Sequence, residues 1–147
     1  MFHTVIFGFN RPAHMKRLLD SLLDNEEASS TPVTIYIDGP RNNEDLSLIQ
    51  QTIAIANSYN ALFQNVKVIA RTKNFGSASN IIEGVTEQFK HNEAIIVLED
   101  DIVVSKKFLH YMNLALNKYK NTKNIFHISA YSDFDEFPDE EGEPDDF

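Results

Sequence analysis

Short hydrophobic runs alternate with amphipathic helical stretches along most of the chain, and this alternation restricts the fold more than any other feature. Five runs have the length and near-continuous apolar character of buried strands: 4–9, 33–37, 66–70, 94–98 and 125–129. The stretches between them repeat apolar residues every three or four positions. The alternation predicts an α/β fold of three layers, in which helices cover both faces of a mostly parallel sheet of about five strands.

Each helical stretch has its own signals. Pro12 suits a first helical position, because its missing N–H would have no partner there. Ser105 is predicted to be the N-cap of the last helix. The apolar stripe of the third helix consists of Ala78, Ile81, Ile82, Val85 and Phe89.

The charge is divided unevenly along the chain. Of 22 Asp and Glu residues, nine lie in residues 133–147, which contain no Lys or Arg. The remaining 13 acids balance the 13 Lys and Arg residues of residues 1–132. We therefore expect one α/β domain over residues 1–132, followed by an acidic tail, 133–147, whose composition is typical of disorder.

Composition excludes several classes of protein. A neutral body has no basic surface for a nucleic-acid backbone. The absence of cysteine excludes disulfides and thiolate chemistry. No run approaches the roughly 18 apolar residues of a transmembrane helix, and the N-terminus lacks a signal peptide, so a cytoplasmic location is expected. An unpaired sheet edge at 125–129 would favour a homo-oligomer.

The candidate site lies where the strands end. Right-handed crossovers place the carboxyl ends of parallel strands at one edge of the sheet, which is where α/β proteins bind ligands. The polar residues that follow the first four strands are Asn10, Arg11, Asp38, Arg71, Lys73, Asn74, Glu99, Asp100 and Asp101.

Three consecutive carboxylates raise one another's pKa unless a cation lies among them. Mg²⁺ or Mn²⁺ would supply that cation and would also neutralise a diphosphate. The basic residues of the same edge suit phosphate oxygens. This combination indicates a pocket for a nucleoside diphosphate. The alternative interpretation of residues 99–101 is a polar turn whose acids favour the start of the next helix.

In these residues the chain resembles the GT-A nucleotide-sugar glycosyltransferases. The resemblance implies the GT-A fold, which is Rossmann-like, in a truncated form. The chain is most similar to the N-acetylglucosaminyltransferase I type and to the bacterial family 2 enzymes near it. The resemblance runs from about residue 3 to residue 132. The segments that carry it are 5–12, 35–39, 97–105 with Phe108, and 128–131.

The resemblance implies a metal-dependent, inverting transfer of a sugar from a nucleoside diphosphate, with UDP-sugar as the expected donor, to a glycan or other hydroxyl acceptor. It makes Asp101 the ligand of Mn²⁺ or Mg²⁺ beneath the diphosphate. Glu99 and Asp100 would lie nearer the ribose and sugar, Asp38 would contact the base, and Arg11 would position the nucleotide.

One departure limits what the chain is expected to do. Enzymes of this class usually have roughly 250 residues or more, consistent with a larger domain, and their general base follows the stretch that is matched. Asp133, Asp135 and Glu136 are candidates without defined geometry, so the catalytic base is not identified. We therefore interpret the chain as the donor-binding half of a glycosyltransferase.

Two alternatives to this interpretation remain, and a third is excluded. A non-catalytic nucleotide-sugar-binding module would keep the same residues. A sugar-nucleotide nucleotidyltransferase is less consistent with the sequence, because no Gly-rich loop follows the first strand. A phospho-acceptor receiver module is excluded, since it needs acids after the first strand, where Asn10 and Arg11 stand.

Overall fold

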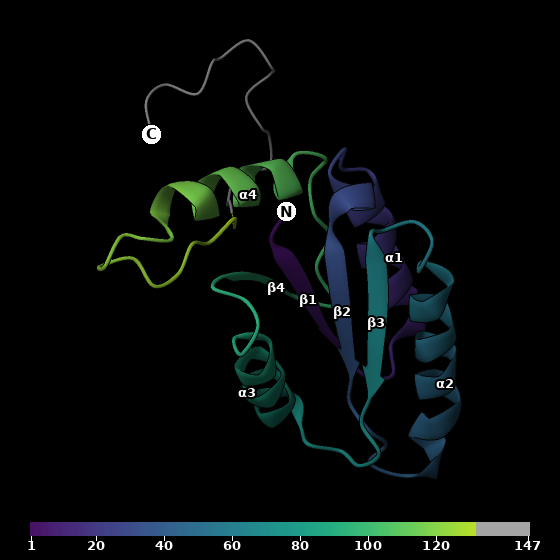
Figure 1. Cartoon of the computed structure of the whole chain (residues 1–147). Helices are drawn as coiled ribbons and strands as arrows, with labels where there is room; N and C mark the ends of the chain where they lie inside the picture. The colour runs from purple at the N-terminus through teal and green to yellow at the C-terminus, as the bar shows by residue number, and fades with distance from the viewer. Residues whose placement is uncertain (132–147) are drawn as a thin grey trace.

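The computed structural model describes residues 1–131 (Figure 1). The predicted tail, 133–147, lies outside the described residues, and so do the three candidate bases Asp133, Asp135 and Glu136. The boundary predicted at residue 132 therefore stays a prediction.

A parallel sheet forms the centre of the fold (Figure 1). Its strand order is β3-β2-β1-β4, and every neighbouring pair is parallel. All four carboxyl ends therefore meet at one edge, as the sequence predicts. The strands are β1 (His3–Gly8), β2 (Pro32–Ile37), β3 (Asn65–Ala70) and β4 (Ile95–Glu99).

Helices cover both faces of the sheet, which confirms the three-layer α/β prediction. Ile6, Ile35 and Leu98 pack with α1 and α2 on one face, and Val5, Phe7 and Tyr36 pack with α3 on the other. The separation follows from the strand period of two, which sends successive side chains to opposite faces. The helices are α1 (Pro12–Leu23), α2 (Asn43–Ser58), α3 (Ser77–Gln88) and α4 (Phe108–Tyr119), with a 3₁₀ turn, η1 (Ala28–Ser30).

Helix α4 lies near the amino ends of the strands, away from the carboxyl edge (Figure 1). The side chain of Asn25 fixes its start, since Oδ1 accepts from the Leu109 N–H at 2.9 Å and Nδ2 donates to the Ser105 carbonyl at 3.1 Å. The predicted N-cap, Ser105, is wrong: Lys107 holds that position, and its own side chain makes no capping hydrogen bond. Asn25 lies outside the helix, and its side chain satisfies a free N–H group of the first helical turn, as an N-cap side chain would.

The apolar stripe predicted for α3 is also partly wrong. Ile82 and Phe89 are 65% and 51% exposed, whereas Asn80, Gly84 and Gln88 are buried. A Cβ at Gly84 would lie 2.5 Å from the ring of Phe7, so glycine lets the helix approach the sheet closely. Gln88 is satisfied in its buried position by donating to the Tyr36 hydroxyl at 2.9 Å. Close approach, rather than apolar character, decides which face of this helix packs.

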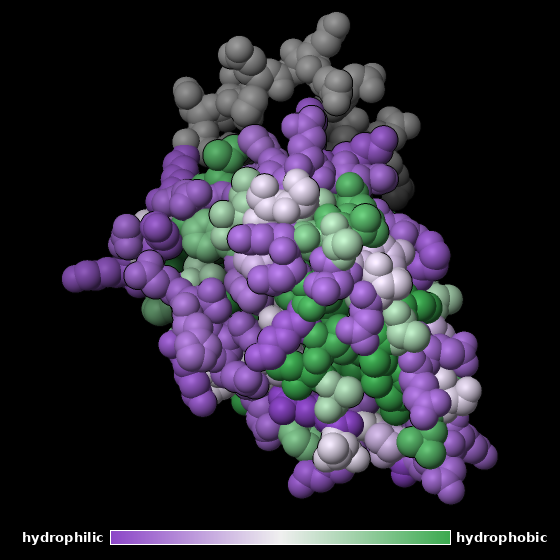
Figure 2. Space-filling model, turned by 45° about the vertical axis from the view of Figure 1, so that its right-hand side comes forward, coloured by the Kyte–Doolittle hydropathy of each residue, from purple (hydrophilic) through white to green (hydrophobic). Residues whose placement is uncertain are grey.

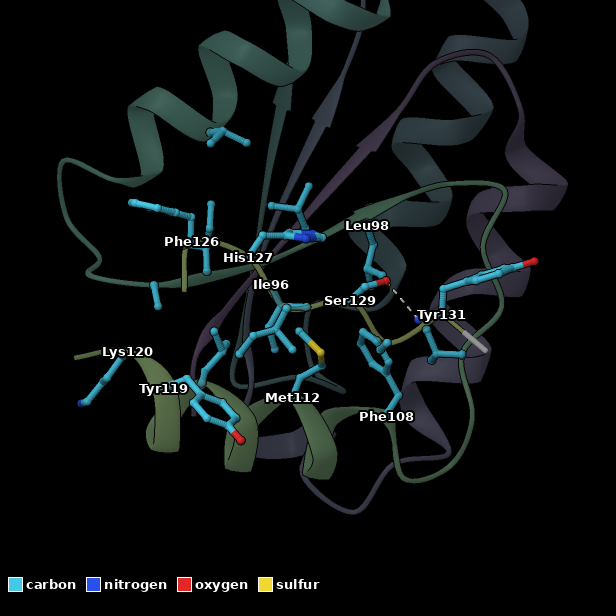
Figure 3. A pocket seen from close by; sticks show the side chains of 18 of the residues that line it. Ile96, Leu98, Phe108, Met112, Tyr119, Lys120, Phe126, His127, Ser129 and Tyr131 are labelled. Atoms are coloured by element: carbon cyan, nitrogen blue, oxygen red, sulfur yellow. Dashed lines mark hydrogen bonds between the residues drawn. The ribbon is translucent and has the colours of Figure 1, made fainter. Parts of the chain in front are cut away.

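The predicted fifth strand, 125–129, does not form within the described part of the chain, so the sheet has four strands rather than five. Its residues border a groove of about 1000 Å³ beside β4. Figure 3 shows Phe126 and Ser129 in this groove with Ile96, Leu98 and Met112. Phe126 is 96% exposed. A strand needs a hydrogen-bonded neighbour, and among residues 1–131 the segment has none.

The surface alternates between polar and apolar regions. Figure 2 shows a face that is mostly hydrophilic and is crossed by a hydrophobic band. Within residues 1–131, no helix has both the length and the apolar character that a membrane span requires.

Candidate functional site

A pocket of about 340 Å³ lies at the carboxyl edge of the sheet, where the sequence predicts the site. This volume is at the lower end of the range for small-molecule sites. Five predicted residues line it, from four separate parts of the chain: Arg11, Asp38, Asn74, Glu99 and Asp100. The other four predicted residues, Asn10, Arg71, Lys73 and Asp101, are not part of its lining.

Arg11 is the cation among the acids that follow β4. Its Nη2 donates to Oδ1 of Asp100, and its Nε lies 3.4 Å from Oδ2. Its Nη1 lies 3.4 Å from Oδ2 of Asp101. The neighbouring acids require a cation at this position, and a guanidinium from the loop after β1 supplies one before any metal binds. Glu99 stands apart from this arrangement and is exposed.

Burial sets the electrostatics of this ion pair. The side chain of Asp100 is fully buried, while that of Arg11 is 43% exposed. Burial raises the pKa of Asp100, and the charge of Arg11 offsets part of that rise. The backbone adds rigidity, because the Asp100 N–H donates to the Phe7 carbonyl at 3.0 Å. Asp100 is therefore held firmly, whereas Arg11 has solvent on one side.

The acids of the site offer a divalent cation few protein ligands. Among residues 1–131, no group of three or more His, Cys, Asp or Glu side chains is arranged to hold a metal ion. The side chain of Asp101 is 53% exposed, and its carboxylate lies beside Arg11, which lines the pocket. Mg²⁺ in phosphate-binding sites commonly uses one or two carboxylates together with phosphate oxygens. Asp101 fits that arrangement as a single protein ligand.

Asp38 is 4% exposed and accepts hydrogen bonds from four protein donors. Its Oδ1 accepts from the backbone N–H of Gly39 at 2.9 Å and of Phe75 at 2.8 Å. Its Oδ2 accepts from the Gly76 N–H and from Asn74 Nδ2, both at 3.0 Å. The carboxylate thus joins the end of β2 to the loop between β3 and α3.

Arg71 and Lys73 both lie against aromatic rings. The Arg71 guanidinium is 5.1 Å from the ring centroid of Tyr36 and 4.9 Å from that of Phe75, and its Nε donates to Asn80 Oδ1 at 3.2 Å. Its Nη2 is buried and finds no hydrogen-bond acceptor within residues 1–131. Lys73 Nζ lies 5.5 Å from the Phe75 centroid. Both cations therefore lie against rings, and neither lines the pocket.

Sequence reasoning missed Arg41, a second cation of the pocket lining. Arg41 donates twice to Asp45 at 3.0 Å, and Asn10 donates to the same carboxylate at 2.6 Å. These hydrogen bonds, chiefly from Arg41, hold the pKa of Asp45 at about 2, below its ordinary value of 3.8. The sequence signal that could have identified Arg41 is its spacing of four residues from Asp45, which is typical of an ion pair.

A parallel α/β sheet with a cation-bearing pocket at its carboxyl edge is the arrangement of a Rossmann-like fold, in which ligands bind at that edge. The comparison with family models specifies the class further. The chain belongs to the glycosyl transferase family 2, whose model matches residues 4–139. The family 2 resemblance drawn from the sequence is thereby confirmed. A comparison with curated proteins found no match.

Solved structures share the GT-A fold with this chain. S. aureus TarS has a TM-score of 0.63 at 18% identity, over 81% of this chain and 20% of TarS. TarS 1–349 in complex with UDP-GlcNAc has a TM-score of 0.60 at 20% identity, over 81% and 32%. The mannosyltransferase PcManGT from Pyrobaculum calidifontis, in complex with GDP-Man and Mn²⁺, has a TM-score of 0.56 at 15% identity, over 78% and 32%. The chain spans a third or less of these proteins.

Proposed function

We propose that this chain binds a nucleoside diphosphate sugar at the carboxyl edge of its sheet and forms the donor side of an inverting, metal-dependent sugar transfer. The observation that carries the proposal is the pocket itself. It combines two guanidinium groups, Arg11 and Arg41, with the acids Glu99 and Asp100. Cations suit the diphosphate, and carboxylates suit the hydroxyl groups of ribose and sugar.

Arg11 is the residue best placed to meet the diphosphate. Its side chain is 43% exposed, so a phosphate can approach it without opening the fold. Its partner Asp100 remains buried and keeps the guanidinium oriented toward the rim. Arg41 lies 4.8 Å from the ring centroid of Phe9, which fixes the position of the second cation. The carboxylate of Glu99 and the Oδ1 of Asn74, whose Nδ2 is taken by Asp38 and Gly39, would then meet the ribose and sugar.

Asp101 would hold the Mn²⁺ or Mg²⁺ together with the phosphate oxygens. When bound, that ion would neutralise the negative charge that develops on the leaving diphosphate. PcManGT is described in complex with both GDP-Man and Mn²⁺, which supports a metal in a protein of this fold. Asp101 is exposed enough to exchange its long contact with Arg11 for the ion.

A UDP-sugar is the proposed donor, because TarS 1–349 is described in complexes with UDP and with UDP-GlcNAc. The proposed acceptor is a hydroxyl group of a glycan or similar molecule. A carboxylate would take its proton as the sugar is transferred. The candidates Asp133, Asp135 and Glu136 lie outside the described residues.

Calorimetry with UDP, with and without Mn²⁺, tests the proposal. We expect Mn²⁺ to strengthen UDP binding, and Asp101→Ala to lose roughly tenfold in Mn²⁺-supported affinity, about 1.4 kcal/mol. Asp24→Ala is the matched control, since Asp24 is exposed at the far end of α1. Absence of UDP binding, or an Asp101→Ala variant that binds as the parent does, would contradict the proposal.

A non-catalytic binding module is the second candidate. The observation in its favour is that Asp100, the buried acid of the pocket lining, is already paired with Arg11, an arrangement that suits binding rather than proton transfer. Both candidates bind the donor, so binding does not separate them. An assay of UDP-sugar hydrolysis and transfer does, since only the enzyme releases UDP.

A further inference from the structure

We propose that Asp38 is a positioning residue: it holds the loop at residues 74–76 in place as a wall of the donor pocket and does not itself recognise the base. This differs from the base contact that the family resemblance implies. The part of the proposal that concerns nucleotides rests on the proposed function. The part that concerns the loop does not.

The acceptor capacity of Asp38 is already used. An ionised carboxylate offers about four lone-pair positions. Protein donors take two at each oxygen, at distances from 2.8 to 3.0 Å. A base would have to displace one of these donors to reach the carboxylate, leaving a buried or partly buried N–H without its partner.

The surrounding contacts show that two chain segments are joined here. The Asp38 N–H donates to the Gly8 carbonyl at 2.9 Å, which ties the residue to β1. Asn74 Nδ2 also donates to the Gly39 carbonyl at 2.9 Å. A Cβ at Gly39 would lie 2.4 Å from the backbone of Lys73, so the two segments pack backbone against backbone. Asp38 therefore stands at the junction of β1, β2 and the loop.

The loop that Asp38 holds forms part of the pocket. Asn74 and Gly76 both line it, and Gly76 adopts a positive φ of 77° immediately before α3. Glycine adopts positive φ about as readily as negative φ, so its own backbone does not select this conformation and a contact must do so. The Gly76 N–H donates to Asp38, which is one contact that fixes it. The donor then meets a wall that is ordered in advance, and this lowers the entropic cost of binding.

Amide hydrogen exchange on the free protein tests the positioning role. An Asp38→Asn variant replaces two acceptor positions with an NH₂ group that faces N–H donors. We expect the Phe75 and Gly76 amides to exchange at least about tenfold faster than in the parent. Ile49→Ala is the control, because it weakens the core beside α2 away from the loop and should leave these two amides unchanged. Unchanged exchange in Asp38→Asn would overturn the proposal.

A second, milder variant tests the same role in case Asp38→Asn does not fold. Asn74→Ala removes one of the four donors to Asp38 and leaves the carboxylate in place. Its expected effect is a smaller rise in exchange at Phe75 and Gly76, and no rise would count against the proposal.

Nucleotide selectivity separates positioning from recognition. If Asp38 positions the loop, Asp38→Asn lowers the affinities for UDP, CDP and GDP by the same factor. If Asp38 recognises the base, the ratio between UDP and the other two changes, and the proposal fails. If the parent binds none of the three, the proposed function fails, and the exchange experiment alone decides the positioning role.

Discussion

Two buried aspartates at the same edge of the sheet are stabilised in different ways. Asp38 follows β2 and is surrounded by uncharged N–H donors. Asp100 follows β4 and is paired with the guanidinium of Arg11. Their exposures are 4% and 1%. Both occupy equivalent places in the sequence, directly after a hydrophobic strand, yet their surroundings give them different roles.

The difference indicates which half of the pocket rim, the half at Asp38 or the half at Asp100 and Arg11, can respond to a ligand. Four short hydrogen bonds fix the Asp38 carboxylate and the loop together, so this half is rigid. The Arg11 side chain is partly in solvent and contacts both Asp100 and Asp101. An ion pair of this kind can exchange one partner for a phosphate at modest cost, because water screens its exposed side. We therefore expect substitutions at Asp38 to affect stability most, and those at the β4 side to affect binding.

Asp38→Ala is expected to have the largest effect. The substitution leaves partly buried N–H groups at Phe75 and Gly76 without an acceptor, and one buried group of this kind costs about 1–3 kcal/mol. We expect a loss of about 3 kcal/mol in the free energy of unfolding. Urea denaturation followed by circular dichroism measures it. A loss below that of Arg11→Ala would reverse the comparison.

Arg11→Ala is expected to cost less, about 1–2 kcal/mol at pH 7, because Arg11 is partly exposed although Asp100 loses its cation. Without Arg11 the pKa of Asp100 rises further, since burial, its largest cause, then acts without the opposing charge of the guanidinium. A raised pKa means that the folded state holds its proton more tightly, so lowering the pH should narrow the difference from the parent. Urea denaturation at pH 7 and pH 4 checks this. An equal difference at both values would show that the pair does not control Asp100.

Asp45 should respond to pH in the opposite direction. Its pKa in the folded protein is about 2, below the ordinary 3.8. Its contribution is therefore present above about pH 4 and is lost as the pH falls toward 2. Thermal unfolding of the parent and of Asp45→Asn should differ at pH 5 and converge near pH 2. Curves that remain parallel throughout would contradict the assignment.

Asp101→Ala should have the smallest effect on stability, within about 0.5 kcal/mol, because its carboxylate is exposed and makes one long contact. The same variant is expected to lose metal-supported UDP binding. Thermal unfolding without ligand measures the first property. A large destabilisation would mean that Asp101 has a structural role. A loss of UDP binding in this variant would then no longer indicate that Asp101 binds the metal.

The strands show what the sequence could predict. Residues 4–9, 33–37, 66–70 and 94–98 were predicted as strands, and each contains most of an observed one. Near-continuous apolar runs identify strands that are covered on both faces, whatever their partners. Residues 125–129 have the same local character, but a strand also needs a neighbour, and local sequence does not supply that information.

The site shows the same division. The order of strands and turns placed Arg11, Asp38, Asn74, Glu99 and Asp100 at one edge, and all five line the pocket. Their pairings were not predictable, because they join residues that are far apart in the chain: Arg11 meets Asp100 across 89 positions. Three adjacent acids indicated a cation among them. An arginine supplies a cation to Asp100 and Asp101, and the metal expected at Asp101 stays a proposal.

The sequence by itself determined the α/β class, the family resemblance and the edge at which polar residues gather, because hydrophobic periodicity and turn residues act locally. Tertiary structure alone decided which donor satisfies each buried carboxylate and which face of α3 packs on the sheet. Those outcomes depend on distances between segments that meet only when the chain is folded. A buried polar group without a hydrogen bond is costly, and this cost favours the arrangement in which each buried carboxylate has its donors.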